Sequence, residues 1–140
     1  MITRLNPSNE VQTAILTALQ ADAALLALSP RIYPPQAPNN PVRPFVLYGS
    51  VIATPNKVDG GDCADLSVAI HAFTNSSTAK PDGRGAALDI ASNIARVLDD
   101  LDVEIGDGMT MKVYVQQIQC MQDGDASAWH SFVTVRAEAS

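Results

Sequence analysis

The clearest pattern of apolar and polar positions lies in the second half of the chain and predicts a helix over residues 82–101. Its apolar residues recur at alternating spacings of four and three, which places them on one side of a helix. The stripe consists of Ala87, Ala91, Ile94, Leu98 and Leu101, widened by Ile90 and Val97. Asp82 precedes the stripe and suits the N-cap. The positions outside the stripe are mostly polar, so this central helix is expected to cover a sheet.

A second helical pattern lies near the N-terminus. Asn6 and Ser8 both suit an N-cap and Pro7 suits the first helical position. Apolar residues then recur at helical spacing as far as Ala21. Asp22 suits the cap of a further short turn rich in leucine. The sequence therefore predicts one N-terminal helix followed by a short helical turn that ends before Pro30.

Two segments before the central helix are typical of strands. Residues 45–52 form a continuous β-prone run in which Gly49 suggests a bulge. Residues 64–73 alternate, with Leu66, Val68, Ile70 and Ala72 on one side. The stretch from Thr54 to Asp62 between them contains Pro, Asn, Asp and Gly, which indicates a turn or a long hairpin tip. We expect a hairpin whose tip reaches outward.

Two further strand patterns follow the central helix. Residues 111–120 alternate, but the parity changes at Gln116 and Gln117, which a bulge would explain. A turn over residues 122–126 leads to a last alternating strand that ends near Glu138. Residues 101–108 hold Val103 and Ile105 between acidic residues and end in a Gly-Asp-Gly turn. The predicted fold class is α+β: a mainly antiparallel four-stranded sheet with an N-terminal helix and a central helix packed on it, as one domain over residues 1–140.

The segment from Pro34 to Pro44 is rich in proline. Five of its eleven residues are prolines, and the short extended piece Arg31-Ile32-Tyr33 precedes it. Proline lacks the N–H that a strand ladder needs, so this segment is expected to form an extended, stiff loop.

Composition narrows the class of protein. With 140 residues, 46% of them hydrophobic, the chain can bury a core of ordinary size. The net charge is −6 and the Lys and Arg residues are scattered singly, which argues against a surface that grips phosphates. We find no apolar run long enough for a signal peptide or a membrane span, so we expect a protein of the cytoplasm in which Cys63 and Cys120 stay free thiols.

Candidate metal sites are weak in this sequence. The soft or imidazole ligands are Cys63, His71, Cys120 and His130, and no two of them are closer than eight positions. Structural zinc sites take their ligands in close pairs, so we expect no metal at these residues. The acidic turns Asp59–Asp62 and Asp123–Asp125 lack the downstream glutamate of a calcium loop, and we interpret them as turns.

Candidate catalytic and binding motifs are equally weak. Pro81–Gly85 could present amides to an anion at a helix N-terminus, but it lacks the lysine of a phosphate-binding loop. The carboxylates of Asp99, Asp100 and Asp102 lack a second cluster to work with, and we interpret them as a solvated acidic patch. No serine lies in a Gly-x-Ser-x-Gly motif. The residues themselves therefore predict no catalytic, cofactor-binding or metal site, and no particular function.

A family resemblance adds what residue chemistry does not. It is carried by apolar patterns and local phrases along nearly the whole chain. These are Val11–Leu19, Asp22–Leu28, Arg31–Tyr33, Pro44–Gly49, His71–Phe73, Ala95–Leu98 and Phe132–Arg136. Together they resemble the small tail-completion or tail-terminator proteins of long-tailed bacteriophages and related gene-transfer particles. The chain departs from that family at Gly85-Ala86-Ala87, where a polar residue and a glutamate are usual, and in its longer proline loop.

The resemblance implies a non-enzymatic virion protein of the tail or neck, without cofactor and without membrane contact, assembled in the cytoplasm of the host bacterium. Such proteins form a ring, commonly a hexamer, that docks on the last ring of the tail tube protein. The ring stops tube polymerisation and offers a surface to the head connector or stopper protein. The hairpin tip at Thr54–Asp62 and the Pro34–Pro44 loop are then candidate contacts with neighbours or partners.

The same resemblance gives the negative charge a role, because an acid-lined hole would let DNA pass through without specific binding. Three alternatives stay open at this point: another neck component such as a head-completion adaptor, a small cytosolic enzyme, and a monomeric binding module.

Overall fold

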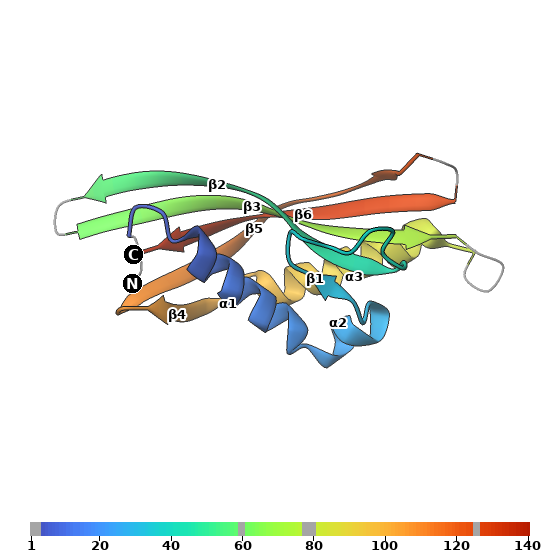
Figure 1. Cartoon of the computed structure of the whole chain (residues 1–140), viewed down its shortest axis with the longest axis horizontal. Helices are drawn as coiled ribbons and strands as arrows, with labels where there is room; N and C mark the ends of the chain where they lie inside the picture. The colour runs from blue at the N-terminus through green and yellow to red at the C-terminus, as the bar shows by residue number, and fades with distance from the viewer. Residues whose placement is uncertain (1–3, 59–60, 77–80, 125–126) are drawn as a thin grey trace.

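The computed structural model describes residues 4–58, 61–76, 81–124 and 127–140, and within them the chain forms three helices and six strands. Figure 1 shows the strands as one twisted sheet, with the helices against one of its faces. In chain order the elements are α1 (Ser8–Gln20), α2 (Ala23–Leu28), β1 (Ile32–Tyr33), β2 (Phe45–Val58), β3 (Gly61–Asn75), α3 (Gly83–Leu98), β4 (Asp102–Gly106), β5 (Met109–Gln122) and β6 (Ala128–Ala139).

The sheet differs from the one expected. Its strand order is β1-β2-β3-β6-β5-β4. The β1 strand runs parallel to β2, and every other neighbouring pair is antiparallel. The prediction of a mainly antiparallel four-stranded sheet is therefore wrong, because the sheet is mixed and has six strands.

The two strands that were missed are the short ones at the edges. β1 contributes only Ile32 and Tyr33, paired with Val46 and Leu47 of β2. In β4 the acidic residues alternate with Val103 and Ile105, a composition that also suits a polar turn. Strands this short have little pattern of their own and depend on the longer strand beside them.

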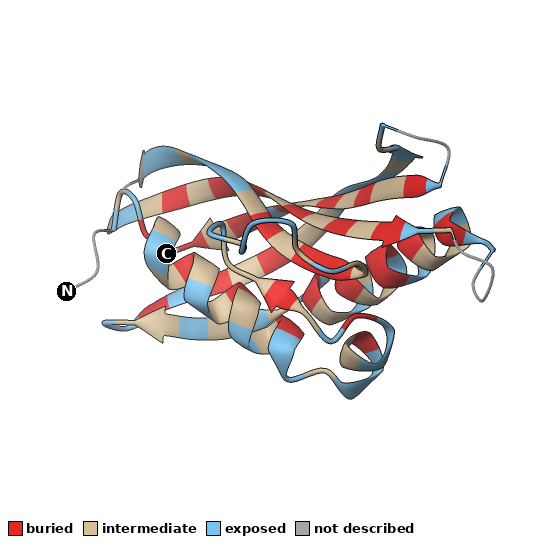
Figure 2. Ribbon diagram, turned by 45° about the vertical axis from the view of Figure 1, so that its right-hand side comes forward, coloured by how far each residue is buried: buried red, intermediate tan, exposed pale blue. Residues whose placement is uncertain are grey.

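The core lies between the helices and one face of the sheet, which we call the inner face. Leu66, Val68 and Ile70 of β3 have no exposed surface, as expected from their alternation. On α3 the predicted stripe is buried at Ala87, Ala91, Ile94 and Leu98, and also at Ile90. Leu101 lies beyond the end of the helix. Figure 2 shows the resulting bands of buried and less buried residues along the strands.

Both predicted bulges are present. The register between β2 and β3 shifts between Tyr48 and Val51, and that between β5 and β6 shifts between Val115 and Gln117. Pairing of β2 with β3 continues to Val58, so most of the stretch expected as a turn or tip is regular strand. Residues 59 and 60, at its end, lie outside the described part of the chain.

The N-cap of α1 differs from the prediction. The helix begins at Ser8 with Pro7 as its N-cap, and no side chain caps it. The N–H of Val11 donates to the Pro7 carbonyl at 2.9 Å, which closes the first turn. Proline thus occupies the position just before the helix and not its first turn.

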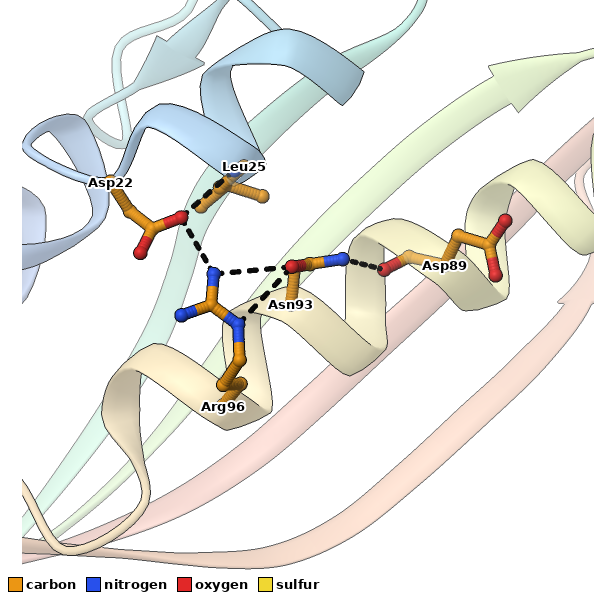
Figure 3. Close-up of polar contacts among 5 residues, drawn as sticks. All are labelled: Asp22, Leu25, Asp89, Asn93 and Arg96. Atoms are coloured by element: carbon orange, nitrogen blue, oxygen red, sulfur yellow. Dashed lines mark hydrogen bonds and ion pairs between the residues drawn. The ribbon is translucent and has the colours of Figure 1, made fainter.

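The cap of α2 also joins two helices (Figure 3). The Asp22 carboxylate accepts from the N–H of Leu25 at 2.9 Å, as predicted for a cap, and from Arg96 of α3 at 2.7 Å. Arg96 also donates to Asn93, whose amide donates to the carbonyl of Asp89. The hydrogen bond from Arg96, followed by that from Leu25, lowers the pKa of Asp22. This exposed network connects α2 to the solvent-exposed side of α3.

Candidate interaction surfaces

Of the four residues considered as metal ligands, only the two histidines come together. His71 of β3 and His130 of β6 are neighbours. Cys63 lies eight residues before His71 on the same strand, which is about 26 Å at strand spacing. Cys120 pairs with Ser131, which faces α3, so it lies on the opposite face of the sheet from His130. Within the described residues no group of three or more His, Cys, Asp or Glu is placed to hold a metal ion.

The two histidines belong instead to an aromatic cluster on the face away from the helices, which we call the outer face. The cluster consists of Phe45, His71, Phe73, His130 and Phe132. Phe73 stacks on Phe45 and on His130, with ring centroids 4.8 Å and 4.4 Å apart. Nδ1 of His71 lies 2.6 Å from Nε2 of His130. Because one nitrogen must donate and the other accept, this contact requires that the two imidazoles are not both protonated.

Burial lowers the pKa values of both histidines. Desolvation, and then the charge of His130, lowers the pKa of His71 below 6.5. Desolvation also lowers the pKa of His130, where Asp123 acts in the raising direction and Arg43 in the lowering direction. Gly49 leaves space for the ring, because a Cβ there would lie 2.5 Å from atoms of the His71 imidazole.

The end of the proline loop is anchored on this cluster. The Arg43 guanidinium lies 5.3 Å from the centre of the Phe73 ring and pairs with the Asp123 carboxylate at 2.6 Å. It also donates to the carbonyl of Thr74 at 3.1 Å. The Pro34–Pro44 segment was expected to be an extended, stiff loop that contacts neighbours or partners, and its C-terminal end is held against the sheet. Val42, beside the anchor, is 61% exposed.

The helix N-terminus considered as an anion site is occupied by the protein itself. The Asp82 carboxylate accepts from the N–H of Gly85 at 2.8 Å, which confirms Asp82 as the cap of α3. The Ser76 hydroxyl accepts from the N–H of Gly83 at 3.0 Å. These two amides are therefore not free to bind an anion.

The acidic residues weighed as chemistry take local structural roles where the structure describes them. Asp99 accepts from the N–H of Val115 at 3.0 Å and so ties the end of α3 to the bulge of β5. Asp100 adopts a left-handed backbone conformation with φ of 62°. The calcium-like turns fall partly outside the described residues, at 59–60 and 125. Asp123, from the second of them, pairs with Arg43.

A surface groove lies between α1 and β4. It encloses about 570 Å³. Its lining residues are Asn9, Glu10, Thr13, Ala14, Thr17, Ala18, Ala21, Val103, Glu104 and Ile105. Among these the small and apolar side chains outnumber the charged ones, and both charges are negative. Sequence reasoning missed this groove because it did not recognise β4 as a strand.

The free part of β2 is a second uncovered surface. β1 pairs only with Val46 and Leu47, so among the described residues no strand pairs with the other side of β2 from Gly49 to Val58. Ile52 and Val51 in this part are 68% and 38% exposed. Exposed apolar residues on a long free edge strand favour association with another chain.

Membrane insertion by a helix has no support among the described residues, since none of their helices combines the length and apolar character of a membrane span.

Comparison with known proteins gives two findings. Residues 13–139 match the family described as "Tail completion protein gp17". Among solved structures, the chain is similar to a chain from "Virion of native gene transfer agent (GTA) particle", with a TM-score of 0.78 and 20% sequence identity. That similarity covers 92% of this chain and 93% of the other, and at this identity it shows a shared fold. No curated protein matches.

Proposed function

Because the chain belongs to the family described as tail completion protein gp17, we propose that it is a tail terminator that closes the end of a virion tail. Family membership itself identifies a structural protein of the tail or neck of a phage or gene transfer agent particle. The proposal is more specific: six subunits of the protein form a ring on the last ring of the tail tube. There it ends tube polymerisation and offers its opposite side to the head connector or stopper protein.

The observation that carries this proposal is the family match over residues 13–139. Two further observations support it. The fold is shared with a chain from a gene transfer agent virion. The free part of β2 and the groove between α1 and β4 are different surfaces of one subunit. A ring requires heterologous contacts between two such different surfaces on every subunit. In this proposal the protein works by fitting between larger assemblies and not by catalysis.

Electron microscopy of particles made without the protein tests the proposal. A terminator sets where the tube stops, so its loss is expected to give tails of abnormal length that do not join heads. Supplying the wild-type protein in trans should restore normal tails. Adding purified protein to growing tail tubes in vitro should likewise stop their elongation.

A different result would identify the nearest alternative. Tails of normal length that fail to join heads would contradict termination and favour a head-completion role. Normal, infectious or transfer-competent particles without the protein would contradict both roles.

A further inference from the structure

We propose that the free part of β2 in one subunit adds as a parallel strand to the free edge of β4 in the next subunit. The sheets of neighbouring subunits would then be continuous around the ring. This inference rests on the proposed function, because it names the contact through which the proposed ring closes.

The directions of the two edge strands fit this arrangement. From β2 to β4 the sheet passes through β3, β6 and β5, and each of the four steps is antiparallel. β2 and β4 therefore point the same way, and Figure 1 shows the free part of β2 and β4 at the same end of the molecule. A head-to-tail repeat of subunits brings β2 of one beside β4 of the next as parallel neighbours. Two copies joined through β2 alone would instead form a closed dimer.

Within the described parts of the chain, β4 is the last strand of the sheet and pairs only with β5, so its other edge has hydrogen-bonding groups to offer. The N–H of Val113 in β5 donates to the carbonyl of Leu101 at 2.9 Å, so Leu101 faces β5. In an antiparallel ladder, alternate residues face the partner and the intervening ones face away. By this alternation Val103 faces β5, whereas the N–H and C=O of Asp102 and Glu104 face the free side.

The backbone of β2 matches it. The N–H of Val46 donates to Arg31 on the β1 side, so Val46 and its partner Ala72 face away from each other. By the same alternation, Val68, Leu66 and Ala64 of β3 also have their backbone groups directed away from β2. The residues of β2 paired with them therefore have their backbone groups on the free side of β2. These partners are Val51, Ala53 and Pro55. Pro55, which has no N–H, lies where no bond to β3 is needed.

The side chains and charges are also complementary. The groove beside β4 offers Ala14, Ala18, Val103 and Ile105 as apolar walls. The free part of β2 brings Val51, whose partner Val68 is buried on the inner face, so that Val51 points to the same side of the sheet as the groove. Its sequence from Gly49 to Val58 contains one lysine and no acidic residue, whereas the charged residues lining the groove are Glu10 and Glu104. An added strand would thus cover apolar surface on both subunits and place opposite charges in one interface.

Proline substitution on the free side tests the backbone pairing directly. Glu104→Pro removes the outward N–H of β4, and Ala53→Pro does the same on β2, without removing a bond inside the subunit. Each variant is mixed with tail tubes, and rings are counted by electron microscopy. We expect association at least about tenfold weaker than wild type, because the lost bond recurs at every interface. Glu104→Gln removes the same charge but keeps the N–H, and should still form rings.

A side-chain variant tests the same interface without altering a strand. Thr17 is an exposed residue of α1 that lines the groove, so Thr17→Arg would fill the place of the added strand. Ser92→Arg introduces the same charge at an exposed position of α3 away from the groove. We expect Thr17→Arg to lose rings and Ser92→Arg to keep them. Circular dichroism and thermal melting establish that each variant is folded. If a proline variant does not fold, the result for Thr17→Arg tests the interface in its place.

The outcomes separate this inference from the proposed function. If wild type forms rings and folded Glu104→Pro, Ala53→Pro and Thr17→Arg form them equally well, the strand pairing is wrong and the terminator proposal stands. If wild type caps no tubes and forms no ring with them, the proposed function fails and this inference fails with it. A closed dimer of wild type, seen by light scattering in the presence of tubes, also contradicts the pairing.

Discussion

At the scale of single residues, the contact between His71 and His130 is the one most sensitive to its surroundings. The two residues are 59 positions apart in sequence and meet because β3 and β6 are neighbours, with Phe73 paired to His130 and His71 paired to Phe132. Their close contact holds while at least one imidazole is neutral. Protonating both would place two positive charges side by side on a half-buried surface.

This contact predicts a pH dependence of stability. Both histidines have folded-state pKa values below the ordinary 6.5, so the unfolded chain binds more protons between these values and 6.5. The contribution of the two histidines to the free energy of unfolding is therefore fully present above about pH 6.5. It is lost as the pH drops toward the folded-state pKa values. Urea denaturation at a series of pH values from 7.5 to 5.5 should show this decrease in wild type.

The control for this prediction uses the small number of histidines. The chain contains two, so the double variant His71→Gln/His130→Gln has no imidazole left to titrate. Its free energy of unfolding should be nearly constant over the same range. An unchanged wild-type value between pH 7.5 and 5.5 would show that folding does not lower the pKa values of the two histidines.

At the scale of elements, α3 is the helix that packs on the three neighbouring strands β3, β6 and β5 of the sheet. Its capping residue Asp82 and its buried stripe were both recognisable in the sequence. Two buried hydroxyls reinforce it, because Thr74 donates to the carbonyl of Gly83 and Ser131 donates to that of Ala87. Apolar packing and these bonds together fix the helix on the inner face.

The buried stripe of α3 predicts a large loss of stability on truncation. Ile94 has no exposed surface, so Ile94→Ala removes buried methyl groups and leaves a cavity. We expect this to lower the free energy of unfolding by about 2–5 kcal/mol. Ser92→Ala, two positions away on the exposed side, should change it by about 0.5 kcal/mol or less. Equal effects of the two substitutions in urea denaturation would show that α3 is not oriented as described.

At the scale of the whole molecule, the net charge and the pairing of the arginines bear on contact with DNA. The chain carries a net charge of −6. Among the residues that the structure describes, three arginines are paired with acidic residues: Arg43 with Asp123, Arg96 with Asp22, and Arg136 with Asp65 and Glu138. Paired cations contribute less to a phosphate-binding surface than free ones would.

We therefore predict that the protein does not bind duplex DNA. Fluorescence anisotropy of a labelled duplex, at low and at physiological salt, should show no saturable binding to the subunit or to the ring. A protein that held DNA would bind more tightly at low salt, because phosphate contacts release counterions. Saturable binding that weakens steeply with salt would contradict an acid-lined passage and would assign the ring a DNA-gripping role.

Comparison of sequence and structure shows which features are local. The α3 stripe, the Asp22 and Asp82 caps, the alternation of β3 and the bulges near Gly49 and Gln116 were all predicted correctly. Each depends on residues within a few positions of one another, through helix periodicity, strand alternation or side-chain capping. Sequence alone determined these because the physics that produces them acts over a few residues.

Tertiary structure decided the rest. β1 and β4 became strands because longer strands lie beside them, and with β4 came the groove against α1. The pairing of His71 with His130 and the anchoring of Arg43 on Asp123 join residues 59 and 80 positions apart. Which edges of the sheet stay free depends on how all the strands are ordered. No local pattern encodes that order, because it follows from the packing of the whole chain around one core.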